Sequence, residues 1–190
     1  MEALIEIDKA LFLWLNGLGS PPFDWFWMMM THRASNVILY LLLWLFFIYK
    51  TNWKSGLILL VFTGILVLCT DQFTNFVKSS VARLRPCYDE EVMALVRMVK
   101  STCGNRFGFF SGHASNSFAL AVFYSHLLKP FLKKKVLILY LIAALIAYSR
   151  VYIGVHFPLD ILIGALVGAT IGNVFHSLWY WLITRMEPKI

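Results

Sequence analysis

The stretch SGLILLVFTGILVLCTDQFTNFV, Ser55 to Val77, is apolar over about the ~20 residues that a helix needs to cross a bilayer. It runs directly into KSSVARLRP, Lys78 to Pro86, which carries three cations and ends in a proline. Because proline cannot continue a helix, this pattern predicts a membrane-spanning helix that ends in a basic segment at the membrane boundary.

Further apolar stretches predict further spans, so we expect an all-α, polytopic bundle of transmembrane helices. Apolar residues make up 59% of the 190-residue chain and charged residues only 14%, which is not the composition of an ordinary soluble domain. A β-barrel would require alternating ten-residue strands, and the sequence shows none. The predicted spans cover residues 36–49, 55–77, 114–128, 136–149 and 159–183.

The first 33 residues allow two interpretations. Residues 3–18 are apolar but include three charged side chains, and a Gly-Ser-Pro-Pro sequence then breaks the run. These residues form either a pair of interfacial helices, which we favour narrowly, or a sixth span made by a bent helix. We therefore expect an N-terminal segment, 1–33, followed by one membrane domain, 34–190, with five to six spans in all.

The net charge of +7 comes from basic residues that lie between the apolar runs. We therefore expect membrane lipids and phosphate groups as partners, and no nucleic acid. With five alternating spans the two membrane faces carry eight basic residues each, but three on the second face are assigned to phosphate below. Removing those three leaves eight against five, which places the first face in the cytoplasm. The first face carries Lys50, Lys54, Lys129, Lys133, Lys134, Lys135, Arg185 and Lys189.

Two of the three cysteines, Cys87 and Cys103, flank one long polar loop on the non-cytoplasmic side. That compartment is oxidising in many bacteria, which permits a disulfide between them. Two free thiols fit the sequence equally well, so both alternatives stay open.

The basic segment after the second span suggests a phosphate site. Lys78 and Arg85 are seven residues apart, so a continued helix would place both on one face, with Arg83 on another. An Arg fork and a Lys point charge together suit a phosphate dianion. The alternative is basic side chains that snorkel from a helix end. Asp71, seven residues before Lys78, is expected either to orient Lys78 or to make a structural hydrogen bond.

A second cluster, FSGHAS at residues 110–115, precedes the third predicted span. Ser111 can cap that helix, whose free N–H groups attract an anion. Gly112 lets the backbone come close to the anion, and His113 would lie beside it with a proton to give. The alternative is a capped helix with an interfacial histidine.

The third cluster is SRVYIGVHFPLD, Ser149 to Asp160. Asp160 follows His156 by four residues and can accept a hydrogen bond from one imidazole nitrogen, which leaves the other free to act as a nucleophile. The alternative is a structural His–Asp pair at a helix cap. Five alternating spans would bring this cluster, with Arg150, to the same membrane face as the other two. Because the five histidines form no ligand cluster, we expect no metal and no other cofactor.

Together these clusters resemble the motifs of the type 2 phosphatidic acid phosphatase (PAP2) superfamily, Lys-x6-Arg-Pro, Pro-Ser-Gly-His and Ser-Arg-x5-His-x3-Asp. The resemblance covers residues 55–183 and departs from the family at Phe110, where the family has proline. It implies that His156 attacks phosphorus, that Asp160 orients it, and that His113 protonates the leaving group and then activates water. The phosphate oxygens would be held by Lys78, Arg85, Arg150, Ser111 and Gly112, with Ser149 in a supporting position.

In its small size the chain resembles bacterial undecaprenyl-diphosphate and phosphatidylglycerophosphate phosphatases. We therefore expect a metal-independent phosphatase of an envelope lipid in the bacterial inner membrane, with its site facing the periplasm or exterior. Undecaprenyl diphosphate is the first candidate substrate. Phosphatidylglycerophosphate, phosphatidate and lipid A stay open as substrates, because the sequence of the loop 87–109 does not indicate which head group it selects. A lipid phosphotransferase with the same nucleophile and a non-catalytic membrane scaffold also stay open, and the sequence does not indicate an oligomeric state.

Overall fold

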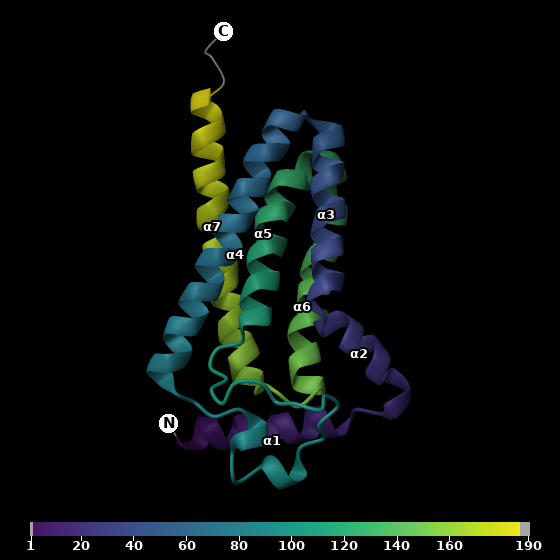
Figure 1. The fold of residues 1–190 in the computed structure, drawn as a ribbon, viewed down its shortest axis with the longest axis vertical. Coiled ribbons are helices and arrows are strands. Elements are labelled where there is room, and N and C mark those ends of the chain that lie inside the picture. The colour runs from purple at the N-terminus through teal and green to yellow at the C-terminus, as the bar shows by residue number, and fades with distance from the viewer. Residues whose placement is uncertain (1, 187–190) are drawn as a thin grey trace.

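The structure, a computed structural model, describes residues 2–186 and consists of long, roughly parallel helices with one helix lying across their end (Figure 1). Residues 2–186 contain no β-strand; an isolated bridge pairs Leu84 with Phe107. The all-α prediction is therefore confirmed, while Lys189, which was counted above for the orientation, lies outside the described residues. The α-helices are α1 (Glu2–Gly17), α2 (Asp24–Thr31), α3 (Arg33–Lys50), α4 (Trp53–Val81), α5 (Gly112–Leu132), α6 (Leu137–Tyr152) and α7 (Pro158–Met186).

The five predicted spans correspond to α3–α7, with ends that differ by a few residues. Short 3-10 helices occupy the connections at Pro21–Phe23, Pro86–Tyr88, Met93–Leu95 and Lys133–Val136. Residue Asn52 caps α4 by accepting a hydrogen bond from the Ser55 N–H, 2.9 Å away. The sequence pattern therefore located the long helices, and local capping groups set their ends.

Three of these helices, α3, α4 and α7, are long and apolar enough to cross a membrane. Large apolar side chains point outward from them and give the bundle an apolar surface that suits lipid. The prediction of five to six spans is not confirmed, because α6 has only 16 residues and α5 is less apolar. The polar side chains of α5, such as Ser115 and Ser117, are buried inside the bundle, so they need no contact with lipid.

The centre of the bundle is α5, which lies among α3, α4, α6 and α7 (Figure 1). Small residues on α7 let it approach α5 closely, as the stripe of Gly164, Gly168 and Gly172 predicts. The contact is closest at Gly168, where a Cβ atom would lie 2.1 Å from the Ser115 carbonyl oxygen. Glycine at this position is therefore required by the packing of the two helices.

At one end of the bundle α1 lies across the other helices, and α2 leads obliquely into α3 (Figure 1). Helix α1 is part of the packed structure: the Phe12 ring is fully buried and meets the Phe157 ring edge-on at 5.2 Å. This arrangement supports an interfacial position for α1, which stays a prediction, as does the division of the chain at residue 33.

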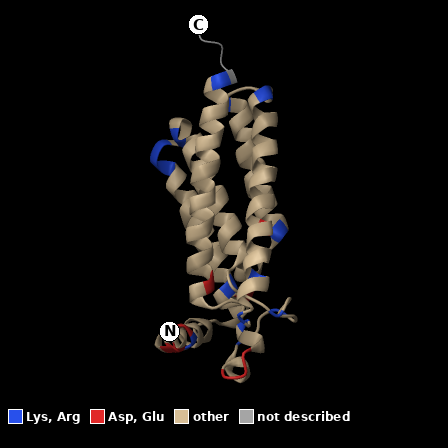
Figure 2. Cartoon of the chain, turned by 90° about the vertical axis from the view of Figure 1, so that its left-hand side faces the viewer, with Lys and Arg blue, Asp and Glu red and all other residues tan. Residues whose placement is uncertain are grey.

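Charged residues lie mainly toward the two ends of the bundle, and most of its middle carries none (Figure 2). In this view the acidic residues lie mainly at the end formed by α1 and the loop 82–111, while the opposite end shows basic residues. Such a distribution is typical of a protein whose middle is surrounded by lipid.

The glycine stripe yields a stability test. Gly168→Ala should destabilise the protein by about 1–3 kcal/mol, because the new methyl group meets the backbone of α5. The matched control is Gly64→Ala on α4, where a Cβ atom would have nothing within 4 Å. Thermal unfolding of the purified protein in detergent measures both; equal melting temperatures for the two variants would contradict the packing role.

Candidate functional site

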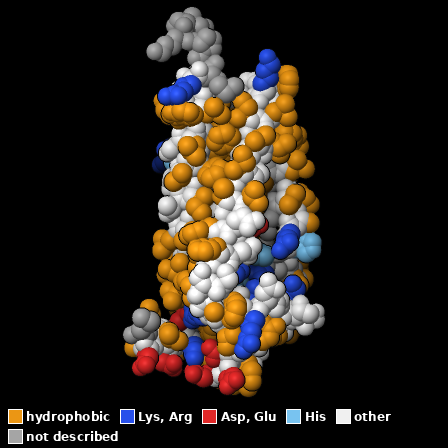
Figure 3. Space-filling view, turned by 60° about the vertical axis from the view of Figure 1, so that its left-hand side comes forward, with side chains coloured by type: hydrophobic (Ala, Val, Ile, Leu, Met, Phe, Trp, Pro, Cys, Tyr) orange, Lys and Arg blue, Asp and Glu red, His pale blue; other side chains and the backbone are white. Residues whose placement is uncertain are grey.

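A cavity of about 950 Å³ lies where the three sequence clusters meet. Its polar end is lined by Lys78 from α4, Arg85 from the following loop, His113 from α5, Arg150 from α6 and His156 from the α6–α7 connection. In the space-filling view, basic and histidine side chains gather in a hollow in the lower half of a largely apolar face (Figure 3). Residues far apart in sequence are thus brought to one place.

Arg85 reaches this cavity by a different route from the one that the sequence predicted. Helix α4 ends at Val81, where Ala82 adopts a left-handed conformation with φ 52° and donates to the Lys78 carbonyl oxygen at 3.0 Å. Arg85 therefore lies in the loop and not on the helix face that carries Lys78. The loop fixes its guanidinium, since Nη1 donates to the Cys103 carbonyl oxygen at 2.9 Å.

None of the three cations named above has a carboxylate partner. Lys78, Arg85 and Arg150 form no salt bridge with any described residue, although Arg85 and Arg150 are only 8% exposed. Burial lowers the pKa of the Arg85 guanidinium, which reflects the cost of desolvating a charge. The Nε of Arg150 and the hydroxyl of Thr74 are also buried without a hydrogen-bond partner among residues 2–186. This end of the cavity is therefore suited to an anion.

His156 is oriented by Asp160 as the spacing predicts. Its Nδ1 lies 3.2 Å from Asp160 Oδ2, which also accepts the Phe157 N–H at 3.0 Å. Because a carboxylate only accepts, Nδ1 carries the proton and Nε2 keeps a free lone pair. Burial, and after it the nearby positive charge of Arg150, hold the pKa of His156 well below its usual range. The ring is therefore neutral at physiological pH, as a nucleophile must be.

The second oxygen of Asp160 binds Arg83, a residue that the sequence reasoning set aside. Arg83 Nη1 donates to Asp160 Oδ1 at 2.8 Å, and Arg83 Nη2 donates to Asp8 Oδ2 at 2.6 Å. Asp8 also accepts the Leu159 N–H at the start of α7, at 2.8 Å. A chain of charged groups thus runs from α1 to His156. An acid in a largely apolar helix, as Asp8 is in α1, is the sequence signal that a partner exists.

The other histidine, His113, is held by the end of α2. Its Nε2 lies 3.2 Å from the carbonyl oxygen of Thr31, and the Thr31 hydroxyl accepts a hydrogen bond from Arg150 Nη1. The N-terminal region therefore contributes to both halves of the site, through Asp8 and through Thr31.

Two further predicted residues do not line the cavity. Ser111 is fully buried, and its hydroxyl accepts the Ala114 N–H at 3.4 Å, so it caps α5 as predicted but lies behind the wall of the cavity. The hydroxyl of Ser149 donates to the Ile146 carbonyl oxygen of its own helix at 2.6 Å. Gly112 does line the cavity, against Thr74 of α4.

Asp71 also lines the cavity, further along α4 from the cations. Of the two predicted roles, the hydrogen-bond contacts favour the structural one, because Asp71 forms no salt bridge with Lys78. Its Oδ1 instead accepts from Asn116 Nδ2 at 2.7 Å. The partner of Asp71 is therefore on α5.

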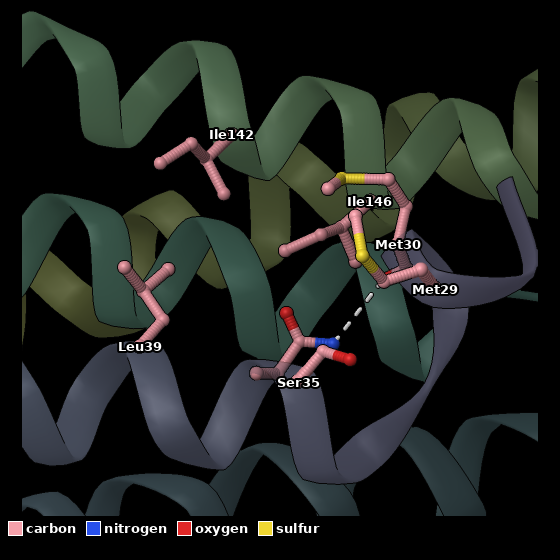
Figure 4. A pocket seen from close by; sticks show the side chains of 7 residues that line it. Met29, Met30, Ser35, Leu39, Ile142 and Ile146 are labelled. Carbon is pink, nitrogen blue, oxygen red and sulfur yellow. Dashed lines mark hydrogen bonds between the residues drawn. The ribbon is translucent and has the colours of Figure 1, made fainter. Parts of the chain in front are cut away.

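Two further features are a disulfide next to Arg85 and a second pocket. Cys87 and Cys103 form a disulfide in the structure, which closes the loop beneath Arg85. A smaller pocket of about 240 Å³ lies between α2, α3 and α6 and is lined mostly by apolar side chains such as Met29 and Ile142 (Figure 4).

Among residues 2–186 no three His, Cys, Asp or Glu side chains are placed to hold a metal ion. The chemistry of this structure is therefore concentrated at the cationic end of the large cavity.

The fold and the site define an integral membrane protein with a buried anion pocket next to a carboxylate-oriented histidine. Residues 55–184 match the sequence profile of the PAP2 superfamily. Because this match covers well over half of the chain, the protein belongs to the PAP2 superfamily.

Similar proteins include two curated relatives and two solved structures. The lipid A 4'-phosphatase of Porphyromonas gingivalis is 33% identical over 150 residues, 78% of this chain and 63% of the relative. That of Bacteroides thetaiotaomicron is 37% identical over 125 residues, 65% of this chain and 56% of the relative. The matched chain thus spans less than two thirds of either relative.

Among solved structures, Aquifex aeolicus LpxE has a TM-score of 0.64 at 26% identity, over 88% of this chain and 93% of that one. A phosphatidylglycerolphosphate phosphatase from Bacillus subtilis, of the transmembrane PAP2 type, has a TM-score of 0.69 at 21% identity, over 100% of this chain and 90% of that one. The second likeness concerns the fold alone.

The Asp8–Arg83–Asp160 chain predicts an effect of α1 on catalysis. Asp8→Asn keeps an acceptor for the Leu159 N–H but loses the charge that holds Arg83. We expect kcat for a phosphate ester to fall roughly ten- to hundredfold, as when the carboxylate behind a metal-bound histidine is removed. KM should change little, because Arg83 does not line the cavity.

The control for this variant is Glu91→Gln. Glu91 is exposed, and its Oε2 lies 2.5 Å from Nζ of Lys9, which follows Asp8 on α1. The kcat of this control should equal that of the unmodified protein, because an exposed ion pair contributes little. An unchanged kcat for Asp8→Asn would show that α1 does not support His156.

Proposed function

We propose that this protein is a phosphatase of a phosphorylated envelope lipid, and that its substrate is lipid A. The observation that carries the first part is the shape of the cavity. Its cationic end continues, between α3 and α4, into apolar walls formed by Leu41, Trp44, Leu60 and Val67. A phosphate at the cations can therefore keep its hydrocarbon chain among apolar side chains, whereas a soluble phosphate ester would make no use of this surface.

The choice of lipid A rests on the relatives. The two curated relatives are both lipid A 4'-phosphatases, and they support lipid A over undecaprenyl diphosphate, which the sequence had favoured. No feature of the comparisons supports undecaprenyl diphosphate specifically.

The geometry supports a two-step reaction. His113 begins in its protonated form. His156 Nε2 donates its lone pair to phosphorus, the bond to the ester oxygen breaks, and that oxygen takes the Nδ1 proton of His113. Water then gives a proton back to His113 and attacks phosphorus, so that the phosphorus–nitrogen bond breaks and His156 is restored. Because the Thr31 carbonyl oxygen lies at His113 Nε2, Nδ1 is the nitrogen available for both proton transfers.

Charge stabilisation comes from the cations at the polar end. Phosphoryl transfer requires mainly positioning and compensation of negative charge, which Lys78, Arg85 and Arg150 provide without rearrangement. Asp160 compensates the positive charge that develops on His156 as the phosphohistidine forms. The distribution of basic residues supports an inner-membrane protein with this site on the non-cytoplasmic side.

The histidine roles are tested by His156→Ala and His113→Ala. Each should lower phosphate release from lipid A by about a thousandfold or more, as the loss of a nucleophile or of its proton partner does. The control is His126→Ala, whose ring stacks on His176 at 4.2 Å and does not line the cavity, and it should keep full activity. Near-normal phosphate release from either site variant in folded form would refute the assignment.

The same assay decides the substrate. Purified protein should release phosphate from lipid A faster than from phosphatidylglycerophosphate, phosphatidate or undecaprenyl diphosphate. A new phospholipid in place of free phosphate would identify a transferase, and no turnover at all would support a scaffold.

Metal dependence gives a separate test. Since fixed side-chain cations take the place of a divalent ion at the phosphate, activity in excess EDTA should equal activity without it. Inactivation by EDTA that added Mg²⁺ reverses would contradict this mechanism.

A further inference from the structure

The cavity contains an acidic group that the proposed reaction does not use. Asp71 lies on α4, one of the helices that is apolar enough to cross a membrane. A carboxylate in such a helix is costly in lipid, so intramembrane acids have partners and commonly a function. The phosphate reaction requires positive groups, so its chemistry does not explain Asp71.

Protein contacts satisfy only part of this carboxylate. Oδ1 accepts from Asn116 Nδ2 at 2.7 Å, and the Asn116 side chain is in turn bound by the Thr70 hydroxyl. Oδ2 has no hydrogen-bond partner within residues 2–186, and Asp71 forms no salt bridge there, not even with Lys78. The carboxylate is therefore fixed in orientation but keeps one free acceptor oxygen at the wall of the cavity.

The position of Asp71 relates it to the substrate lipid. Asp71, Asn75 and Lys78 follow one face of α4, and all three line the cavity. Two helical turns, about 10 Å along the axis, separate the Cα atoms of Asp71 and Lys78. A lipid whose phosphate is bound at Lys78 therefore places the groups between its phosphate and its chains near Asp71.

We propose that Asp71 is a specificity residue, which accepts a hydrogen bond from an amide N–H or a hydroxyl of the phosphorylated lipid. The proposal rests on the proposed function and narrows its substrate class to lipids that carry such donors close to the phosphate, as acylated amino sugars do. A carboxylate can only accept. Phosphatidate offers ester oxygens at the corresponding positions, and a prenyl diphosphate offers no neutral donor and brings a second anion.

The test compares two lipids that differ in this respect. Ceramide 1-phosphate and phosphatidate each carry one phosphomonoester and two chains, but only the first has an amide N–H and a hydroxyl next to the phosphate. The unmodified protein should have a kcat/KM about tenfold higher for ceramide 1-phosphate, the effect of one hydrogen bond to a charged acceptor. In Asp71→Asn and Asp71→Leu this ratio should fall towards one.

The ratio is measured on a single preparation, so it does not depend on how much of a variant is folded. Glu90→Gln, which removes an exposed carboxylate outside the cavity, is the control and should keep the ratio of the unmodified protein. A ratio near one in the unmodified protein, or an unchanged ratio in the Asp71 variants, would overturn the inference and leave the phosphatase function intact. No phosphate release from any lipid phosphate would overturn the proposed function itself.

Discussion

The site depends on one fully buried carboxylate, that of Asp160. One of its oxygens faces His156 Nδ1 and the Phe157 N–H, and the other accepts from Arg83. A buried charge is tolerated only when its hydrogen-bonding capacity is satisfied, and here three groups from two segments of the chain do so. The same contacts determine which nitrogen of His156 carries the proton. The arrangement that stabilises the charge therefore also orients His156 for the role proposed for it.

On the other side of His156 the buried charges are not compensated, because the cations there have no counter-ion. Desolvated positive charges repel one another, so Lys78, Arg85 and Arg150 destabilise the empty site. In the proposed reaction, binding of a phosphate dianion removes this repulsion, and the transition state, whose charge is spread over the phosphate oxygens, is stabilised as well. The loop 82–111 has a structural part in this, because its backbone carbonyl groups hold Arg85 in place without neutralising it.

The sequence predicted the helices and the meeting of the three clusters because both depend on local patterns: apolar runs of span length and motifs at helix ends. The predictions from the sequence were wrong or incomplete where a backbone conformation or an interaction partner does not follow from neighbouring residues. The left-handed turn at Ala82, which takes Arg85 off the helix, has no glycine to indicate it. The spacing placed Arg83 on another helix face than Lys78, and its partner Asp8 is 75 residues away in the sequence. Ser111 was correctly predicted as a cap, but capping points its hydroxyl at α5 and away from the cavity.

These contacts give the N-terminal helices a role beyond that of a membrane attachment. Helix α1 supplies Asp8, which binds both Arg83 and the first turn of α7, and α2 ends at Thr31, which contacts His113 and Arg150. The two histidines of the proposed reaction thus lie on segments of the bundle that are joined through residues outside the three motifs of the family resemblance. A displacement of α1 and α2 would remove the contacts that hold both histidines, so the site is complete only when the N-terminal region is packed in place.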